Sequence, residues 1–163
     1  MKKLVLDLRN NPGGYVDMAV KIADTFIDSG DIVYTMDRNG KKRYHKAEKG
    51  AVDIPIVTLT NGGSASASEI LIGALKDHGI AKSVGEKTFG KGVTQIPYQF
   101  SDGSIIKVTD SRYYTPSGVC IDKEGIKPDV EVKVDAEKYA DISKMSYSED
   151  EQLRAAVGLL EKE

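Results

Sequence analysis

Apolar and polar residues follow one another in patterns that predict an α/β domain. Residues 3–8 and 55–60 are apolar runs typical of strands buried on both faces. Apolar residues at helical spacing predict helices over 16–29, about 66–78 and 149–162. Strands that alternate with helices in this way predict a sheet with helices packed against it.

Shorter segments around glycine turns predict two antiparallel hairpins. The hairpin strands are residues 31–36 with 42–46, around Asn39-Gly40, and residues 96–100 with 104–114, around Asp102-Gly103. A further strand is expected at 81–85, whereas 86–95 and 115–130 have the composition of loops. We therefore expect a single α/β domain over residues 1–163, built on a mixed β-sheet flanked by helices.

Composition narrows the classes of function. The 163 residues are 40% apolar and 29% charged with a net charge of −2, so nothing favours a nucleic-acid or anionic-membrane partner. No run approaches the roughly 20 apolar residues of a membrane span. One cysteine, Cys120, and two distant histidines, His45 and His78, leave few ways to build a metal site. We expect no metal and no cofactor.

The segment from Asn61 to Glu69 carries the most chemical information. A glycine turn follows a buried strand, and serines spaced by alanines then open a helix. A hydroxyl placed there lies beside unpaired backbone N–H groups that favour negative charge, as a serine hydrolase needs. Local pattern alone favours a different interpretation, a capping box between Ser66 and Glu69. The Gly-x-Ser-x-Gly elbow is not satisfied, because Ser68 lies where the second glycine would be.

Asp77 and His78 do not complete a serine triad. Side chains of adjacent helical residues diverge by roughly 100°, and both residues lie about three turns from Ser66. We expect His78 to be a partly exposed residue near the helix end.

Residues 85–92 nearly match a phosphate-binding loop, yet Gly92 replaces the required hydroxyl and a strand-like segment follows. Nucleotide binding is therefore disfavoured.

A second interpretation of the same segment makes Lys91 a base for Ser66. A lysine at the ordinary pKa of about 10.4 stays protonated, so this role requires burial or apolar surroundings. Phe89 and the nearby glycines suit such a loop, although sequence logic alone favours an ordinary solvated lysine.

Five segments resemble, in order, the motifs of the C-terminal processing peptidases, also called tail-specific serine proteases. They are residues 4–14, 63–70, 84–92, 112–118 and 125–129. The resemblance covers roughly residues 4–130, and the last helix also fits it. More broadly, the expected core resembles the Clp-protease and crotonase-like folds.

The resemblance implies a serine endopeptidase with a Ser–Lys dyad and assigns a role to each matching residue. Ser66 would be the nucleophile, Lys91 the general base, Gln95 the residue that orients the lysine, Gly14 and Ala67 the backbone donors of the oxyanion hole, and Asp77 a supporting residue. A neutral Gln95 suits its role, since a carboxylate there would hold the amine protonated.

The resemblance also implies a biological setting. Substrates would be proteins or peptides with small apolar C-terminal residues, cleaved outside the cytoplasm. Family members usually carry an N-terminal helical segment and a PDZ domain, which this sequence lacks, so we expect the chain to be the truncated core of a longer protein. Apolar surface left exposed would then favour a homo-oligomer.

Two other functions stay open at this point. A non-catalytic remnant of such a protease would bind extended peptides at a sheet edge. An acyl-thioester enzyme of the crotonase type would use paired N–H groups for an enolate, although it needs no serine–lysine pair.

Overall fold

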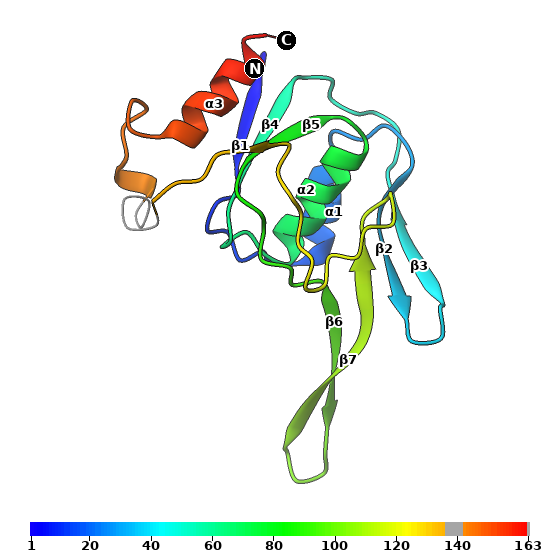
Figure 1. Cartoon of the computed structure of the whole chain (residues 1–163). Helices are drawn as coiled ribbons and strands as arrows, with labels where there is room; N and C mark the ends of the chain where they lie inside the picture. The colour runs from blue at the N-terminus through cyan, green and yellow to red at the C-terminus, as the bar shows by residue number, and fades with distance from the viewer. Residues whose placement is uncertain (136–141, 163) are drawn as a thin grey trace.

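Two four-stranded sheets organise the chain in the computed structural model, which describes residues 1–135 and 142–162 (Figure 1). The predicted α/β class is confirmed. The parallel and the antiparallel strands, which the sequence analysis combined in one mixed sheet, form separate sheets.

The first sheet is parallel, with the strand order β1-β4-β5-β8. Its strands are β1 (Leu4–Asp7), β4 (Ile56–Thr60), β5 (Ala81–Gly85) and β8 (Val130–Glu131). Strand β4 is buried throughout, as the apolar run predicts. The prediction of full burial is wrong for β1, whose residues 4–6 are half-buried, because β1 has a neighbouring strand on one side only.

The second sheet is antiparallel, with the strand order β3-β2-β7-β6. Its strands are β2 (Asp31–Asp37), β3 (Lys42–Lys46), β6 (Val93–Gln99) and β7 (Ile105–Tyr114). Both predicted hairpins are confirmed. Strand β6 starts inside the segment expected to be a loop, because Val93 already pairs with Arg112.

Helices α1 (Val16–Asp24) and α2 (Ala67–Asp77) pack against each other, and α2 also contacts β5 and β2. Helix α3 (Glu151–Leu160) covers the other face of the parallel sheet (Figure 1). Helix α1 ends before the predicted limit of residue 29, because its apolar pattern continues into a turn whose Ile27 still fills the core. The short β8 and the 3-10 helix at Ile142–Lys144 were not predicted.

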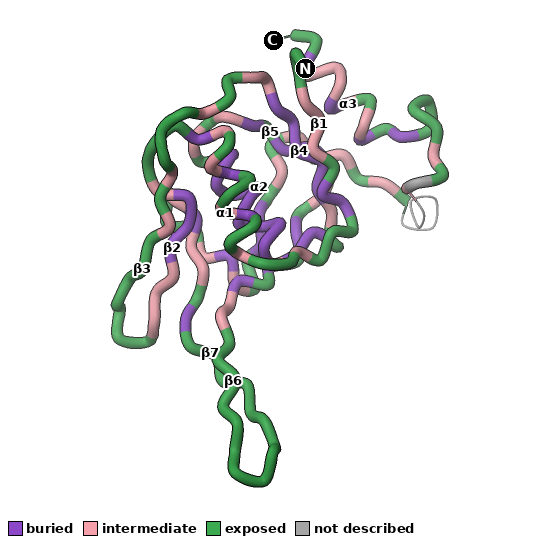
Figure 2. The backbone as a smooth tube through the Cα atoms, turned by 180° about the vertical axis from the view of Figure 1, so that it is seen from behind, coloured by how far each residue is buried: buried purple, intermediate pink, exposed green. Residues whose placement is uncertain are grey.

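The side chains of strand β4 belong to two apolar clusters, one on each face of the sheet, since alternate side chains point to opposite faces. Ile56 belongs to the cluster that includes residues of α1, α2 and β2, whereas Val57 and Leu59 pack with residues of α3. The buried positions gather around β4 and α2 (Figure 2). This double coverage makes β4 the rigid centre on which the following turn is built.

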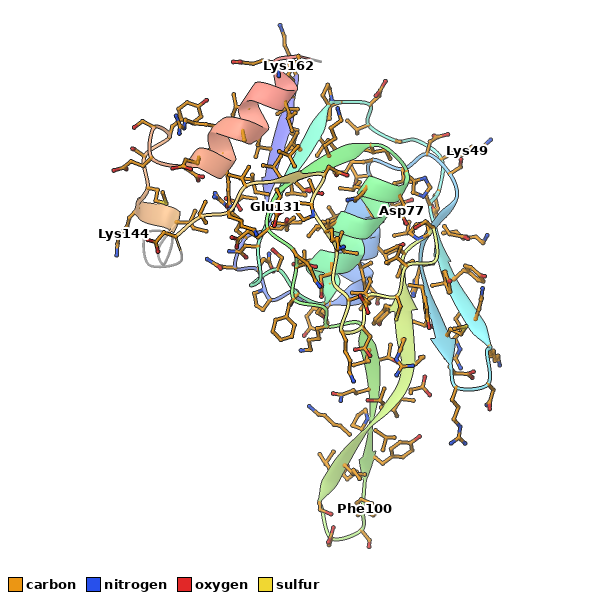
Figure 3. All side chains as sticks on the ribbon, viewed as in Figure 1. Lys49, Asp77, Phe100, Glu131, Lys144 and Lys162 are labelled. Atoms are coloured by element: carbon orange, nitrogen blue, oxygen red, sulfur yellow. The ribbon has the colours of Figure 1, made fainter. Side chains whose placement is uncertain are left out.

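Strands β6 and β7 extend away from the body as a ribbon with Phe100 near its tip (Figures 1 and 3). Ile96 is opposite Val108 and Tyr98 is opposite Ile106, so these four side chains share one face. All four are at least 40% exposed. No helix in the described ranges is long and apolar enough to cross a membrane.

Candidate active site

Three connections meet at the carboxyl edge of the parallel sheet. We call them the glycine turn (residues 8–14, after β1), the serine turn (61–66, after β4) and the lysine loop (86–92, after β5). Because the three strands are parallel neighbours, their carboxyl ends bring these segments side by side. Ligands of α/β sheets commonly bind at this edge.

The glycine and serine turns are held together by reciprocal hydrogen bonds. Asn10 donates its backbone N–H to Asn61 Oδ1, and Asn61 Nδ2 donates to Asn10 Oδ1, both at 2.9 Å. The backbone N–H of Ala65 donates to the carbonyl of Asn11 at 3.0 Å. The two turns therefore form one polar unit above the sheet.

Burial distinguishes the three serines of the run. Ser64 is fully buried and its hydroxyl donates to the Leu8 carbonyl at 2.7 Å. Ser68 is 4% exposed and donates to the Asn11 carbonyl. Ser66 is the half-buried member, so of the three its side chain is the accessible one.

The backbone of Ser66 is strained. Its φ of 59° and ψ of −119° lie in a region that non-glycine residues rarely adopt. Such strain costs about 1–3 kcal/mol and gathers at functional sites. Glu69 helps to hold the conformation, because its carboxylate accepts the backbone N–H of Ser66 at 2.9 Å. The predicted capping contact is thus confirmed.

Gly13 lies directly against the serine turn. At its φ of +92°, a Cβ atom would lie 2.5 Å from the Ala65 carbonyl oxygen and 2.8 Å from the nitrogen of Ala67. Only glycine permits this approach. The N–H of Gly13 is occupied, since it donates to Asn11 Oδ1 at 2.9 Å.

The two backbone donors expected for an oxyanion hole lie next to this contact. Within residues 1–135 and 142–162, neither the N–H of Gly14 nor that of Ala67 donates a hydrogen bond. Both residues line a cavity of about 150 Å³ whose walls include Met18, Ile22 and Leu71. The cavity can hold a small apolar side chain beside two free donors.

The lysine loop is tied to the serine turn. Phe89 donates its backbone N–H to the Ser64 carbonyl at 3.0 Å. The Glu69 carboxylate accepts the backbone N–H groups of Gly90 and Lys91 at 2.6 and 2.8 Å. Because Ser66 and Lys91 both donate to Glu69 Oε2, their backbones are close neighbours.

The side chains of Lys91 and Gln95 lie in solvent, and Phe89 is 66% exposed. Lys91 therefore lacks the apolar surroundings that the role of a base requires. It is the exposed lysine that sequence logic alone favours, although Gly90 and Gly92 on either side of it are buried. In the described part of the chain, no hydrogen bond joins Ser66 Oγ to Lys91 Nζ. Gln95 follows an irregular position in the β6–β7 pairing. The structure brings together the main chains of the expected dyad but not its side chains.

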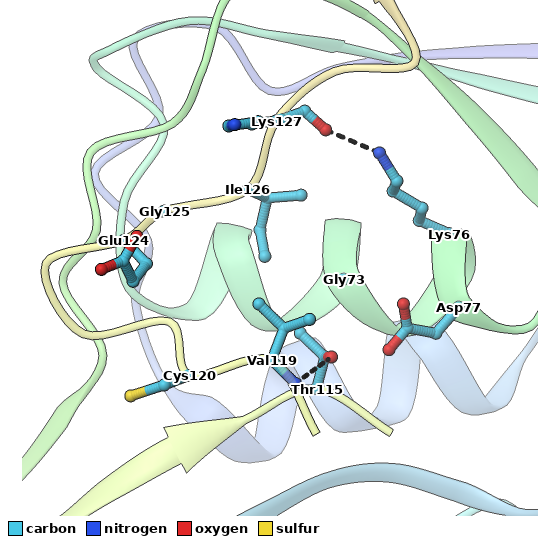
Figure 4. A pocket seen from close by; sticks show the side chains of 10 residues that line it. All are labelled: Gly73, Lys76, Asp77, Thr115, Val119, Cys120, Glu124, Gly125, Ile126 and Lys127. Atoms are coloured by element: carbon cyan, nitrogen blue, oxygen red, sulfur yellow. Dashed lines mark hydrogen bonds between the residues drawn. The ribbon is translucent and has the colours of Figure 1, made fainter. Parts of the chain in front are cut away.

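Asp77 lies at the far end of α2, roughly 16 Å from Ser66 at the helical rise of 1.5 Å per residue. Its carboxylate accepts the backbone N–H of Ser117 at 2.8 Å. It also lines a cavity of about 310 Å³ between α2 and residues 115–127 (Figure 4). His78 is half-buried at the helix end, as expected, and its Nε2 lies 2.8 Å from the Asp31 carbonyl.

An ion-pair clamp, formed by Arg9, Asp7 and Asp150, joins the glycine turn to β1 and to the start of α3. The Arg9 guanidinium is 2.6 Å from Asp7 and 2.8 Å from Asp150, and the latter pair is buried. Burial lowers the pKa of Arg9, but its hydrogen bonds to Asp7 and Asp150 outweigh this and raise the pKa above the ordinary value. Burial likewise opposes ionisation of Asp150, yet the Arg9 contacts lower its pKa.

No group of three His, Cys, Asp or Glu residues that could hold a metal ion occurs among the described residues.

Comparison with known proteins identifies the family. Residues 1–132 match the profile of peptidase family S41. The chain belongs to peptidase family S41. This match over most of the chain confirms the resemblance to the C-terminal processing peptidases that the sequence motifs indicate.

Several relatives are known. The chain is 49% identical over 148 residues to a "Probable CtpA-like serine protease" of Staphylococcus aureus (strain COL), covering 88% of this chain and 29% of the relative. A Staphylococcus epidermidis protein of the same name is 48% identical over 136 residues, covering 81% and 28%. The solved photosystem II D1 C-terminal processing protease is 45% identical with a TM-score of 0.78, covering 82% and 35%. The chain thus spans less than a third of the curated relatives it matches.

Sequence reasoning missed two functional features of this site. It did not foresee that Gly13 packs against Ala65 and Ala67, although a Pro-Gly-Gly sequence signals an unusual backbone. It also treated Glu69 as a cap only. Six apolar or small residues, 70–75, follow Glu69 directly. This pattern could have indicated that Glu69 is buried and has hydrogen-bond partners.

Proposed function

We propose that this chain is the core of a serine endopeptidase in which Ser66 is the nucleophile and Lys91 the general base. The observation that carries the proposal is the strained, accessible Ser66 beside the free N–H groups of Gly14 and Ala67. Membership of family S41 supports the same chemistry.

The proposed reaction proceeds in two stages. Ser66 Oγ forms a bond to the substrate carbonyl carbon while its proton passes to the neutral amine of Lys91. The C–N bond then breaks, and the departing amine takes that proton from Lys91. In the second stage Lys91 accepts a proton from water while the water oxygen bonds to the acyl carbon. The bond between that carbon and Ser66 Oγ then breaks, which releases the acid product, and Lys91 returns its proton to Oγ.

Gly14 and Ala67 would stabilise the negative oxygen of each tetrahedral intermediate through their backbone N–H groups. Lys91 must turn from solvent towards Ser66 for the reaction, and catalytic contacts are often loose before substrate binds. We assign Gln95 the role of orienting the lysine in that closed arrangement. Asp77 would support the site at a distance by fixing the loop that carries Ser117.

The substrates we propose are proteins and peptides whose C-terminal residues are small and apolar. The 150 Å³ cavity beside Gly14 and Ala67 suits such a residue, since Met18, Ile22 and Leu71 line it. The name of one solved relative, a C-terminal processing protease, supports cleavage near the C-terminus of a protein. We further propose that the parent protein acts outside the cytoplasm as a homo-oligomer.

The test is cleavage of an internally quenched peptide that ends in small apolar residues. We expect Ser66→Ala and Lys91→Ala each to reduce kcat by several orders of magnitude, since a nucleophile and its base act as a unit. Ser68→Ala is the matched control. It removes a neighbouring hydroxyl of the same run and should keep kcat within about twofold, because Ser68 is buried and its hydroxyl already donates to the Asn11 carbonyl.

Full activity of either dyad variant would reject the assignment. The solvent position of Lys91 gives weight to one alternative, a protein that binds peptides without cleaving them. Saturable peptide binding with no turnover by the wild-type chain would favour that alternative.

A further inference from the structure

Glu69 is a carboxylate without exposure to solvent at the start of α2. The residues that follow it on the helix, Ile70 to Leu75, are all buried. A buried carboxylate is unfavourable unless its oxygens accept hydrogen bonds. Its presence at a position surrounded by apolar residues therefore requires specific partners.

Four donors converge on this carboxylate. Oε2 accepts the backbone N–H groups of Ser66 and Lys91 at 2.9 and 2.8 Å. Oε1 accepts the Thr88 hydroxyl and the backbone N–H of Gly90, both at 2.6 Å. These distances are typical of strong hydrogen bonds to a charged acceptor.

Helix capping accounts for only one of the four contacts. A capping box needs the N–H of Ser66 alone, whereas the other three donors come from the lysine loop. Thr88 extends the connection, because its hydroxyl oxygen also accepts the backbone N–H of Ile126 at 2.7 Å. One buried side chain thus joins the strained serine turn, the lysine loop and the segment after Lys123.

We propose that Glu69 is a positioning residue that sets the distance between Ser66 and Lys91 during acylation. This inference rests on the proposed function, because it assumes that Ser66 and Lys91 act together. Glu69 does not touch substrate, since it is fully buried. It fixes the two main-chain points from which the nucleophile and the base extend.

The sharpest test is Glu69→Gln, which keeps the shape of the side chain. An amide has one acceptor oxygen, so its NH₂ group must face either the Ser66 and Lys91 donors or the Thr88 and Gly90 donors. We expect the rate at which a fluorophosphonate phosphonylates Ser66, which serves as the measure of acylation in these variants, to fall about 100-fold, the loss that follows from a displacement of about 1 Å. KM for the quenched peptide should change little, while kcat falls with the acylation rate.

Asp129→Asn is the matched control for stability. Asp129 also joins a loop to the sheet, since its Oδ2 accepts both the N–H and the hydroxyl of Ser83 at 2.8 and 2.9 Å. In the described part of the chain, its hydrogen bonds and ion pairs join it to Ser83 and Lys76, and none reaches the serine turn or the lysine loop. We expect it to lower the melting temperature as Glu69→Gln does, with an acylation rate within about twofold of the wild type.

A double variant tests whether Glu69 acts through the lysine. Glu69→Gln combined with Lys91→Ala should acylate no more slowly than Lys91→Ala alone, because the base to be positioned is already absent. Multiplied effects of the two substitutions would overturn the inference, as would a folded Glu69→Gln variant that acylates at the wild-type rate.

If Glu69→Gln does not fold, Thr88→Val decides the question. This variant removes one donor to Glu69 and the acceptor of the Ile126 N–H, and it leaves the other three donors to Glu69. We expect about tenfold slower acylation. A wild-type rate in Thr88→Val would then overturn the inference. A different result would contradict the proposed function. In that case Ser66→Ala would still be labelled, or Lys91→Ala would be labelled at the wild-type rate.

Discussion

At the scale of single residues, backbone conformation decides which groups can serve the site. Ser66 holds a rare φ and ψ because Glu69 and the helix behind it fix its N–H and carbonyl. Gly13, in the glycine turn, packs against Ala65 and Ala67 on either side of Ser66. The sequence indicated a glycine-dependent turn but not which glycine makes the close contact, since that depends on a partner more than fifty residues away.

The two neighbouring glycines make a matched pair of substitutions. Gly13→Ala places a Cβ 2.5 Å from the Ala65 carbonyl oxygen at a positive φ. We expect it to lower the free energy of unfolding by about 1–3 kcal/mol, measured by urea denaturation. In Gly14→Ala the new Cβ meets nothing within 4 Å, so the change should stay below about 1 kcal/mol. Equal losses in the two variants would contradict the packing described here.

At the scale of elements, the apolar patterns located the strands and helices well. Strands 42–46 and 81–85 agree with the prediction to the residue, because glycine turns limit both. Strand β8 was not predicted, because its two residues form a strand by pairing with β5 and show no local sequence pattern. For Lys91, sequence logic alone favoured a solvated side chain, and the residue is exposed in the structure.

Helix α3 is joined to the glycine turn by the clamp of Arg9 and Asp150, which a local pattern cannot reveal across 141 residues. Asp150→Asn removes one partner of a buried guanidinium. Such losses typically reach about 3–5 kcal/mol, but Asp7 still pairs with Arg9, so we expect about 2 kcal/mol. Lys133→Ala breaks an exposed pair with Glu131 and should cost at most about 1 kcal/mol.

The clamp also predicts how stability depends on pH. The pKa of Asp150 is lowered in the folded chain, so the native state releases this proton more readily than the unfolded state. Its contribution is complete above the unfolded pKa of about 3.9 and is lost as pH falls through the native value. As the pH drops below about 4, we expect the melting temperature to decrease, and this decrease should be less steep in Asp150→Asn. Identical pH profiles would contradict the clamp.

At the scale of the whole molecule, the β6–β7 ribbon is exposed over most of its length (Figure 2), and Ile96, Tyr98, Ile106 and Val108 form an apolar face on it. A two-stranded ribbon is marginally stable by itself, and an apolar face of this kind favours association. We expect the chain to self-associate with rising concentration in analytical ultracentrifugation. Tyr98→Ser with Ile106→Ser should reduce this, whereas Gln99→Ser with Lys107→Ser on the other face should not. Equal effects of the two pairs would exclude the apolar face as the cause.

The proposed chemistry depends on Ser66 being the nucleophile, and covalent labelling tests this without any assumption about the natural substrate. The wild-type chain is treated with a fluorophosphonate and digested, and mass spectrometry locates the adduct. We predict a single adduct on Ser66, with Ser64 and Ser68 unmodified because both are buried. A folded chain that carries the adduct on another residue, or no adduct at all, would show that Ser66 is not the nucleophile.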